Sequence, residues 1–213
     1  MTSRPEATAL IGAFTATGQL AELREALAEG LDAGLTVNEI KEILVQLYAY
    51  AGFPRSLNAL GTFMAVLDER RAHGITDPDG AEPNPRPGGR SSFELGAENQ
   101  TKLAGGPVTG PLFDFAPAID EFLKAHLFGD IFGRDNLDWP TREIATVAAL
   151  ANLGGVEGQL RSHLGIALNT GVTVAQLRDL VALLRDRVGA AQGGRAAALL
   201  DVVLTEKNTE TAN

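Results

Sequence analysis

Apolar side chains recur at helical spacing in two regions of the chain, and a region without such a period separates them. The repeating positions are Leu23, Leu27 and Leu31 in the first region and Leu160, Leu164 and Leu168 in the second. Each set falls on one face of a predicted amphipathic helix. From His73 to about Gly110 the chain is rich in Gly and Pro, so we expect a long connector there. Because strand-like alternation is lacking throughout, the pattern predicts an all-α protein.

Both regions carry the same signals for the end of one helix and the start of the next. Gly34 and Gly171 follow the periodic leucines, where a left-handed residue commonly ends a helix. A capping box comes next in each region: Thr36 with Glu39, and Thr173 with Gln176. Another amphipathic helix is therefore predicted after each box.

The two regions align without a gap. Sliding Leu23–Leu67 onto Leu160–Leu204, an offset of 160 − 23 = 137, gives twelve identities in 45 positions. We therefore expect a tandem duplication of one helical unit. The predicted division is a first unit at residues 1–72, the connector at 73–110, a second unit at 111–207 and a tail at 208–213.

Composition narrows the classes of function. The formal net charge of −9 and the lack of a Lys/Arg cluster argue against a nucleic-acid partner. No apolar run has the roughly 20 residues that a bilayer crossing needs, and the start of the chain does not read as a secretory signal. We expect a protein of the cytoplasm that does not enter a membrane. With no cysteine, disulfides and thiol chemistry are excluded.

Two phrases resemble a known family when they are taken together. The segment "FGDIFGRDNLDWPTREIATVAALANLGGVEGQLRSHLGIALNTGVTVAQLRDLV" is similar to the body of the carboxymuconolactone decarboxylase family, and "LTVNEIKEILVQLYAYAGFPRSLNAL" to the C-terminal half of that family. The resemblance covers roughly Leu20–Leu67 and Phe115–Leu204. It implies the helical alkylhydroperoxidase-D-like fold, and an assembly of several copies of the chain that resembles the family's trimers or hexamers.

The resemblance also separates two branches of chemistry. In the peroxidase branch a Cys-x-x-Cys-x-x-x-His motif lies on the same helix, and its positions fall here on Val156, Gln159 and His163. A thiol peroxidase cycle needs a thiolate, so that activity is excluded. The decarboxylase branch works on a small carboxylated lactone, and it implies no cofactor and no metal.

Decarboxylation requires a group that binds carboxylate, an apolar pocket and an acid that delivers a proton. The resemblance implies Asp130, Arg134, Glu157 and His163 as candidates, with His163 as the general acid because imidazole titrates near neutrality. Arg134 or Arg161 would bind the carboxylate of a small-molecule substrate. Glu157 would act across the site or cap its helix. A further glutamate, on the helix predicted between Pro140 and Gly154, stands close to the relay glutamate of the peroxidase branch: Glu143.

A complete site needs pieces from both regions. The position that matches His163 in the first region is Ala26, while the aromatic segment "YAYAGFP" exists only in the first region. We therefore expect a composite pocket in which His163 faces Tyr48 and Phe53. His126 could line the same pocket.

Plainer interpretations stay open. His163 could be a satisfied core histidine, and His126 an ordinary surface histidine. The three histidines lack metal-ligand spacing, so no metal site is predicted. Arg24 and Arg161 occur in both regions, which favours structural ion pairs. The alternative to a lyase is a non-catalytic helical module that binds a small hydrophobic acid or a protein.

Overall fold

The computed structural model describes residues 2–86 and 88–211, and within this part of the chain every regular element is a helix. The all-α class is therefore confirmed. The elements are α1 (Arg4–Thr17), α2 (Leu20–Asp32), α3 (Val37–Gln46), α4 (Tyr48–Ala51), α5 (Phe53–Ala72), α6 (Ser92–Ala104), α7 (Pro111–Phe115), α8 (Pro117–Phe122), the π-helix η1 (Leu123–Ile131), α9 (Trp139–Asn152), α10 (Glu157–Asn169), α11 (Val174–Arg187) and α12 (Ala190–Thr211). Among the helices of the described residues, none has the length and hydrophobicity that crossing a membrane requires.

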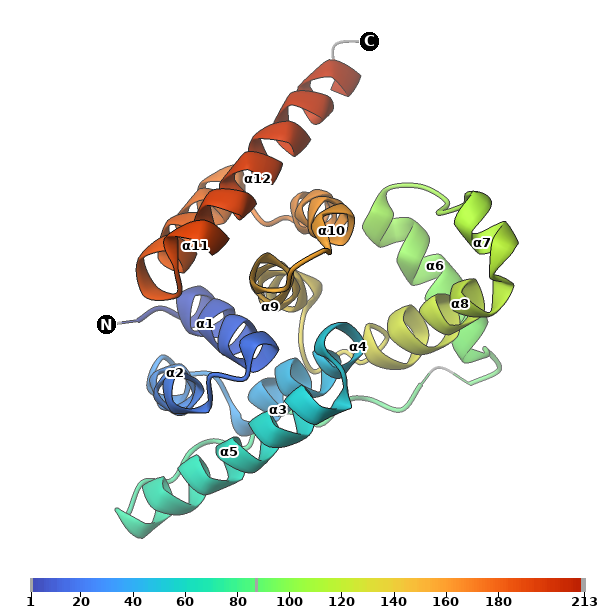
Figure 1. Ribbon diagram of the computed structural model, residues 1–213. Coiled ribbons are helices and arrows are strands. Elements are labelled where there is room, and N and C mark those ends of the chain that lie inside the picture. Colours follow the sequence, from blue (N-terminus) through green and yellow to red (C-terminus); the bar gives the residue numbers. More distant parts are fainter. Residues whose placement is uncertain (1, 87, 212–213) are drawn as a thin grey trace.

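Helices α1 and α9 form the centre of the molecule (Figure 1). Each is buried along ten consecutive residues, from Ala7 to Ala16 in α1 and from Arg142 to Ala151 in α9. The two helices approach closely at Gly12, where a Cβ atom would lie 2.5 Å from the carbonyl oxygen of Ala145. Only glycine fits there without a shift of the backbone.

Two similar sets of amphipathic helices surround this central pair. Helices α2, α3 and α5 pack with α1, and α10, α11 and α12 pack with α9. The members of the two sets start 137 residues apart, since 157 − 20, 174 − 37 and 190 − 53 all equal 137. Gly34 and Gly171 have positive φ angles of 88° and 99°, as expected from the sequence. Both predicted capping boxes are formed.

The segment between the two sets is more ordered than the sequence pattern indicates. Residues 92–104, inside the predicted connector, form helix α6. This helix packs against η1 so closely that a Cβ atom on Gly96 would lie 1.6 Å from the carbonyl oxygen of Lys124. With α7 and α8 they make a separate lobe, residues 92–131, beside α10 (Figure 1). The lobe shares an apolar cluster with Ile166 of α10.

Candidate functional site

A buried histidine–glutamate pair lies at the contact between α9 and α10. The Nδ1 atom of His163 is 2.8 Å from Oε2 of Glu143. Glu143 is fully buried and His163 is 7% exposed. Glu143 sits on the fully buried stretch of α9, where surrounding apolar packing keeps water away from its carboxylate. Because Glu143 occupies Nδ1, the Nε2 atom is the ring nitrogen that is left to meet a ligand.

The second oxygen of Glu143 has no partner. Oε1 is buried and makes no hydrogen bond within the described residues. An acceptor in such a position is costly unless a ligand or another polar group supplies a donor. The carboxylate therefore orients His163 through Oε2 and keeps unused hydrogen-bonding capacity at Oε1.

Tyr50, from the first half of the chain, contacts the ring of His163. It comes from α4, and its ring meets the His163 ring edge-on, with centroids 5.3 Å apart and an interplanar angle of 80°. Burial, and then the nearby negative charge of Glu143, hold the pKa of the Tyr50 hydroxyl well above its ordinary value. The hydroxyl is therefore a neutral group that can donate a hydrogen bond at any physiological pH.

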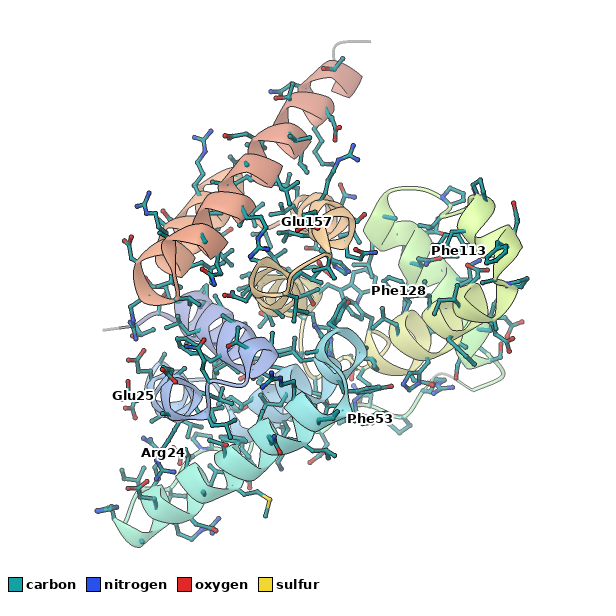
Figure 2. All side chains as sticks on the ribbon, in the orientation of Figure 1. Arg24, Glu25, Phe53, Phe113, Phe128 and Glu157 are labelled. Carbon is teal, nitrogen blue, oxygen red and sulfur yellow. The ribbon has the colours of Figure 1, made fainter. Side chains whose placement is uncertain are left out.

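His163 and Tyr50 line a cavity of about 740 Å³ between α10 and the lobe. The lobe contributes mainly apolar side chains, of which Phe113 and Phe128 are labelled in Figure 2. Helices α10 and α12 contribute polar and charged groups, among them Arg161 and Lys207. The site thus combines a proton-carrying imidazole, cations and an apolar wall.

The other predicted site residues lie outside this cavity. Glu157 is exposed on the first turn of α10, with Oε1 3.8 Å from Nη1 of Arg195. Arg134 binds Glu42 through two nitrogens, at 2.6 Å from Nη2 and 2.9 Å from Nε. The structure therefore brings together His163 and Glu143 but not Glu157 or Arg134.

Four predicted residues form a second cluster instead. His126 Nδ1 lies 3.0 Å from Oδ2 of Asp130, which also accepts hydrogen bonds from Ser92 and Arg86. The His126 ring is 5.6 Å from the Tyr48 ring, and Tyr48 stacks on Phe53 at 4.3 Å. The aromatic contact expected opposite His163 is thus supplied by Tyr50, whereas Tyr48 lies against His126 and Phe53 stacks on Tyr48. Residues two apart on a helical turn point in different directions, which explains why Tyr50 rather than Tyr48 lies beside His163.

Comparison with known proteins identifies a family that matches the segment carrying His163 and Glu143. Residues 117–203 match the carboxymuconolactone decarboxylase family. This segment belongs to that family. The chain is also 36% identical over 70 residues to the 4-carboxymuconolactone decarboxylase of Acinetobacter baylyi (strain ATCC 33305 / BD413 / ADP1). That alignment covers 33% of this chain and 52% of the relative, so the chain spans about half the length of the curated relative.

The carboxymuconolactone decarboxylase segment contains only part of the cavity. His163, Glu143 and the π-helix lie inside residues 117–203, whereas Tyr50 and α6 lie outside them. The cavity is therefore completed by parts of the chain that the family match does not reach.

A buried polar network, which our sequence analysis missed, joins α3 to α9 near the site. Arg142 is fully buried and donates to Oε2 of Glu42 at 3.1 Å and to Oε1 of Gln46 at 3.0 Å. Burial would raise the pKa of Glu42, but the hydrogen bonds and charges of Arg134 and Arg142 lower it overall. Burial likewise lowers the pKa of Arg142. The adjacent charged residues Arg142 and Glu143, in a helix that is otherwise rich in alanine and apolar residues, are the sequence signal that could have revealed it.

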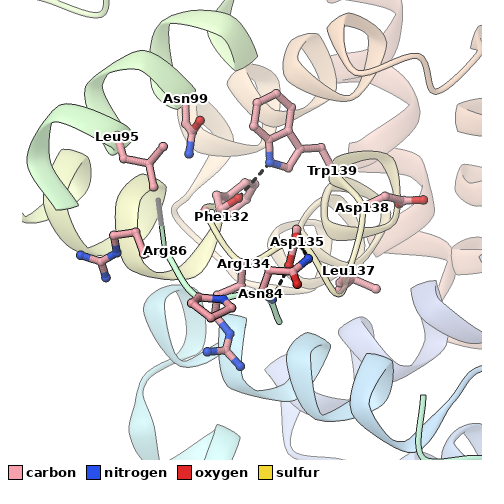
Figure 3. A pocket seen from close by; sticks show the side chains of 12 residues that line it. Asn84, Arg86, Leu95, Asn99, Phe132, Arg134, Asp135, Leu137, Asp138 and Trp139 are labelled. Atoms are coloured by element: carbon pink, nitrogen blue, oxygen red, sulfur yellow. Dashed lines mark hydrogen bonds between the residues drawn. The ribbon is translucent and has the colours of Figure 1, made fainter. Parts of the chain in front are cut away.

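A second hollow, of about 450 Å³, lies beside Arg134 (Figure 3). Its charged groups are occupied: Arg134 binds Glu42, Arg86 binds Asp130, and Asp135 accepts from Asn84. The Trp139 indole donates to the carbonyl oxygen of Phe132 at 3.0 Å. We therefore place the candidate site in the larger cavity at His163.

Proposed function

We propose that this protein is a cofactor-independent lyase that decarboxylates a small carboxylated lactone or keto acid and protonates the product carbon. The observation that carries the proposal is the position of His163, which is hydrogen-bonded to the buried Glu143 and lines a cavity that Arg161 also lines. Membership of residues 117–203 in the carboxymuconolactone decarboxylase family, and the likeness to the Acinetobacter enzyme, support the type of reaction.

Each group has a role in this proposal. Arg161 attracts the substrate carboxylate into the cavity. The bond between the carboxylate and the ring carbon breaks, carbon dioxide leaves, and the electron pair passes into the conjugated carbonyl system. The His163 imidazolium then transfers a proton from Nε2 to carbon, and solvent later returns a proton to the ring.

Glu143 acts through His163. Its carboxylate fixes the ring orientation and stabilises the imidazolium before proton transfer. The Tyr50 ring, which meets the His163 ring edge-on, helps to hold the imidazole in this orientation. The candidates from the sequence alone stay Glu157, Arg134, Asp130, His126, Tyr48 and Phe53. Arg134 is paired with Glu42, and His126 is held between Asp130 and Tyr48, contacts that favour structural roles.

The test is a panel of carboxylated lactones and β-keto acids, assayed for carbon dioxide release. We expect release with the wild-type protein and a loss of about 10²–10⁴-fold in kcat with His163→Gln, the range for a general acid. The control is His73→Gln, since His73 is exposed at the end of α5. Thermal unfolding of both variants checks that the fold survives.

Two outcomes would contradict the proposal. Release that persists undiminished in a folded His163→Gln protein would remove the histidine from the chemistry. Absence of release across the panel would favour the alternative, a non-catalytic module that binds a small hydrophobic acid or a protein partner.

We further propose that the chain is a tandem duplication that acts in the cytoplasm as a homo-oligomer. Equivalent ion pairs support the duplication: Arg24 with Glu69 and Arg161 with Glu206, each residue 137 positions from its counterpart. Exposed apolar side chains such as Leu57, Met64 and Phe115 support the self-association. Sedimentation equilibrium measures the oligomeric state, and a monomer at all concentrations would overturn that part.

A further inference from the structure

The cavity beside His163 has two chemically different walls. The lobe supplies an almost wholly apolar wall, which includes Leu112, Ile119 and Leu127. Helices α10 and α12 supply the opposite wall, which includes Arg161 and Lys207. A ligand that fills this space must therefore be amphiphilic, with its polar end against α10 and its apolar part against the lobe.

The volume of the cavity indicates how large the apolar part of the ligand is. At about 740 Å³ the cavity falls within the range of sites that enclose drug-sized ligands. A compact lactone acid would meet the polar wall near His163 but would have no atoms to place against the side chains of α7 and α8. Water would then remain on apolar surface, which is unfavourable.

Arg161, one of the cations on the polar wall, can exchange its present partner Glu206 for a ligand. Arg161 is paired with Glu206, but the side chains of both residues are about half exposed, at 52% and 45%. Ion pairs in that setting contribute little to stability, so Arg161 can turn toward a ligand carboxylate at low cost. A planar guanidinium binds carboxylate through two parallel hydrogen bonds.

We propose that the substrate of this cavity is a carboxylate with an extended apolar body, either aromatic or medium-chain alkyl. Its carboxylate binds Arg161 in the cavity that His163 also lines, and its body packs on Leu112 and Ile119. The identity of the reacting end rests on the proposed function, whereas the need for an apolar body rests on the lobe wall alone.

Binding of unreactive carboxylates tests this without any catalysis. Isothermal titration would compare benzoate with 4-butylbenzoate, and hexanoate with decanoate, on the full-length protein. We expect affinity to rise about threefold to fourfold for each methylene group that becomes buried. Comparing the gain in affinity within the benzoate pair with that within the alkanoate pair shows whether an aromatic or an alkyl body binds better.

Matched variants locate the apolar contact. Leu112→Gln changes a side chain that lines the cavity and is 65% exposed, and Leu57→Gln changes one that lies on α5 outside the cavity and is 62% exposed. Because both side chains are largely exposed, both variants should fold. We expect Leu112→Gln to remove much of the gain from the longer tail and Leu57→Gln to leave it intact.

A second matched pair locates the carboxylate contact. Arg161→Gln and Arg24→Gln remove equivalent arginines, of which only Arg161 lines the cavity. We expect about a tenfold loss of affinity for every carboxylate with Arg161→Gln, as for a lost charged hydrogen bond, and no loss with Arg24→Gln.

The outcomes separate this inference from the proposed function. Tail-dependent binding that Leu112→Gln weakens, in a protein that releases no carbon dioxide, would support the inference and contradict the lyase. Affinity independent of tail length, or equal effects of Leu112→Gln and Leu57→Gln, would overturn the inference. That would hold even if a compact lactone acid were decarboxylated.

Discussion

The helices α2, α3 and α5 and the helices α10, α11 and α12 have the same local construction, yet only the second set borders the cavity. Both sets have a glycine stop, a threonine capping box and an arginine–glutamate pair at matching positions. They differ at Ala26, which is buried among apolar neighbours where the second set has His163. The lobe also packs against α10 and has no counterpart beside α2. The shared features build the scaffold, and the candidate site lies where the sets differ.

The largest expected effect concerns Glu42, the carboxylate that couples α3 of the first set to the central helix α9. Glu42→Gln leaves the buried Arg142 without its negative partner, and we expect a loss of about 3 kcal/mol in the free energy of unfolding. Its matched control is Asp179→Asn, at the equivalent but exposed position, which should change stability by less than about 0.5 kcal/mol. Urea unfolding measures the change in unfolding free energy for both variants. Similar changes would mean that the buried network stabilises the protein no more than an exposed carboxylate does.

The same residue predicts a dependence on pH. The pKa of Glu42 in the folded protein is below its ordinary value of 4.5, so unfolding takes up a proton. Its stabilising contribution is complete above that value and is lost as pH falls through the lowered pKa. We expect the wild type to lose stability below about pH 4.5 more steeply than Glu42→Gln. Parallel curves would contradict the assignment.

The contact between α1 and α9 gives the next effect. Gly12→Ala drives a methyl group into the backbone of Ala145, and we expect a loss of about 1–3 kcal/mol. Gly61→Ala, in α5 with open space around it, is the control and should stabilise the protein by about 0.5–1 kcal/mol. Thermal denaturation distinguishes the two signs, and a neutral Gly12→Ala would show that the central helices can separate slightly.

A smaller effect tests how alike the two sets are. Thr36→Ala and Thr173→Ala each remove a capping box, and each should cost about 1 kcal/mol of unfolding free energy. Equal losses in urea unfolding would sharpen the comparison. A loss confined to Thr36→Ala would show that the second set is held by packing rather than by its cap.

The smallest expected effect is on the paired arginines. Arg24→Gln and Arg161→Gln remove exposed ion pairs, so neither should shift the melting temperature beyond the error of calorimetry. A clear loss of stability in one variant alone would break the equivalence of the two sets in this respect.

Local signals in the sequence predicted local structure well. Gly34, Thr36 and their counterparts define helix ends through contacts within a few residues, and such contacts are readable from spacing. The family resemblance indicated His163 and Glu143 as separate candidates, and the hydrogen bond between them appears only in the structure. Their catalytic role stays a prediction.

Contacts between distant segments were the ones that sequence reasoning missed. Tyr50, rather than Tyr48, meets His163, because the orientation of the short helix α4 decides which of two neighbouring rings turns inward. Helix α6 was expected to be a connector because Gly and Pro dominate its surroundings. Its stability comes from close packing of Gly96 on the π-helix, which no periodicity in the sequence reveals.

The burial of α1 against α9 has a consequence for how the chain is made. A helix from the first residues finds its main partner only after residues 139–152 have been synthesised. Helices α2, α3 and α5 can cover part of α1 earlier, but the face of α1 that packs on α9 stays without its native partner until these residues leave the ribosome. Completion of the central helix pair therefore depends on the arrival of α9.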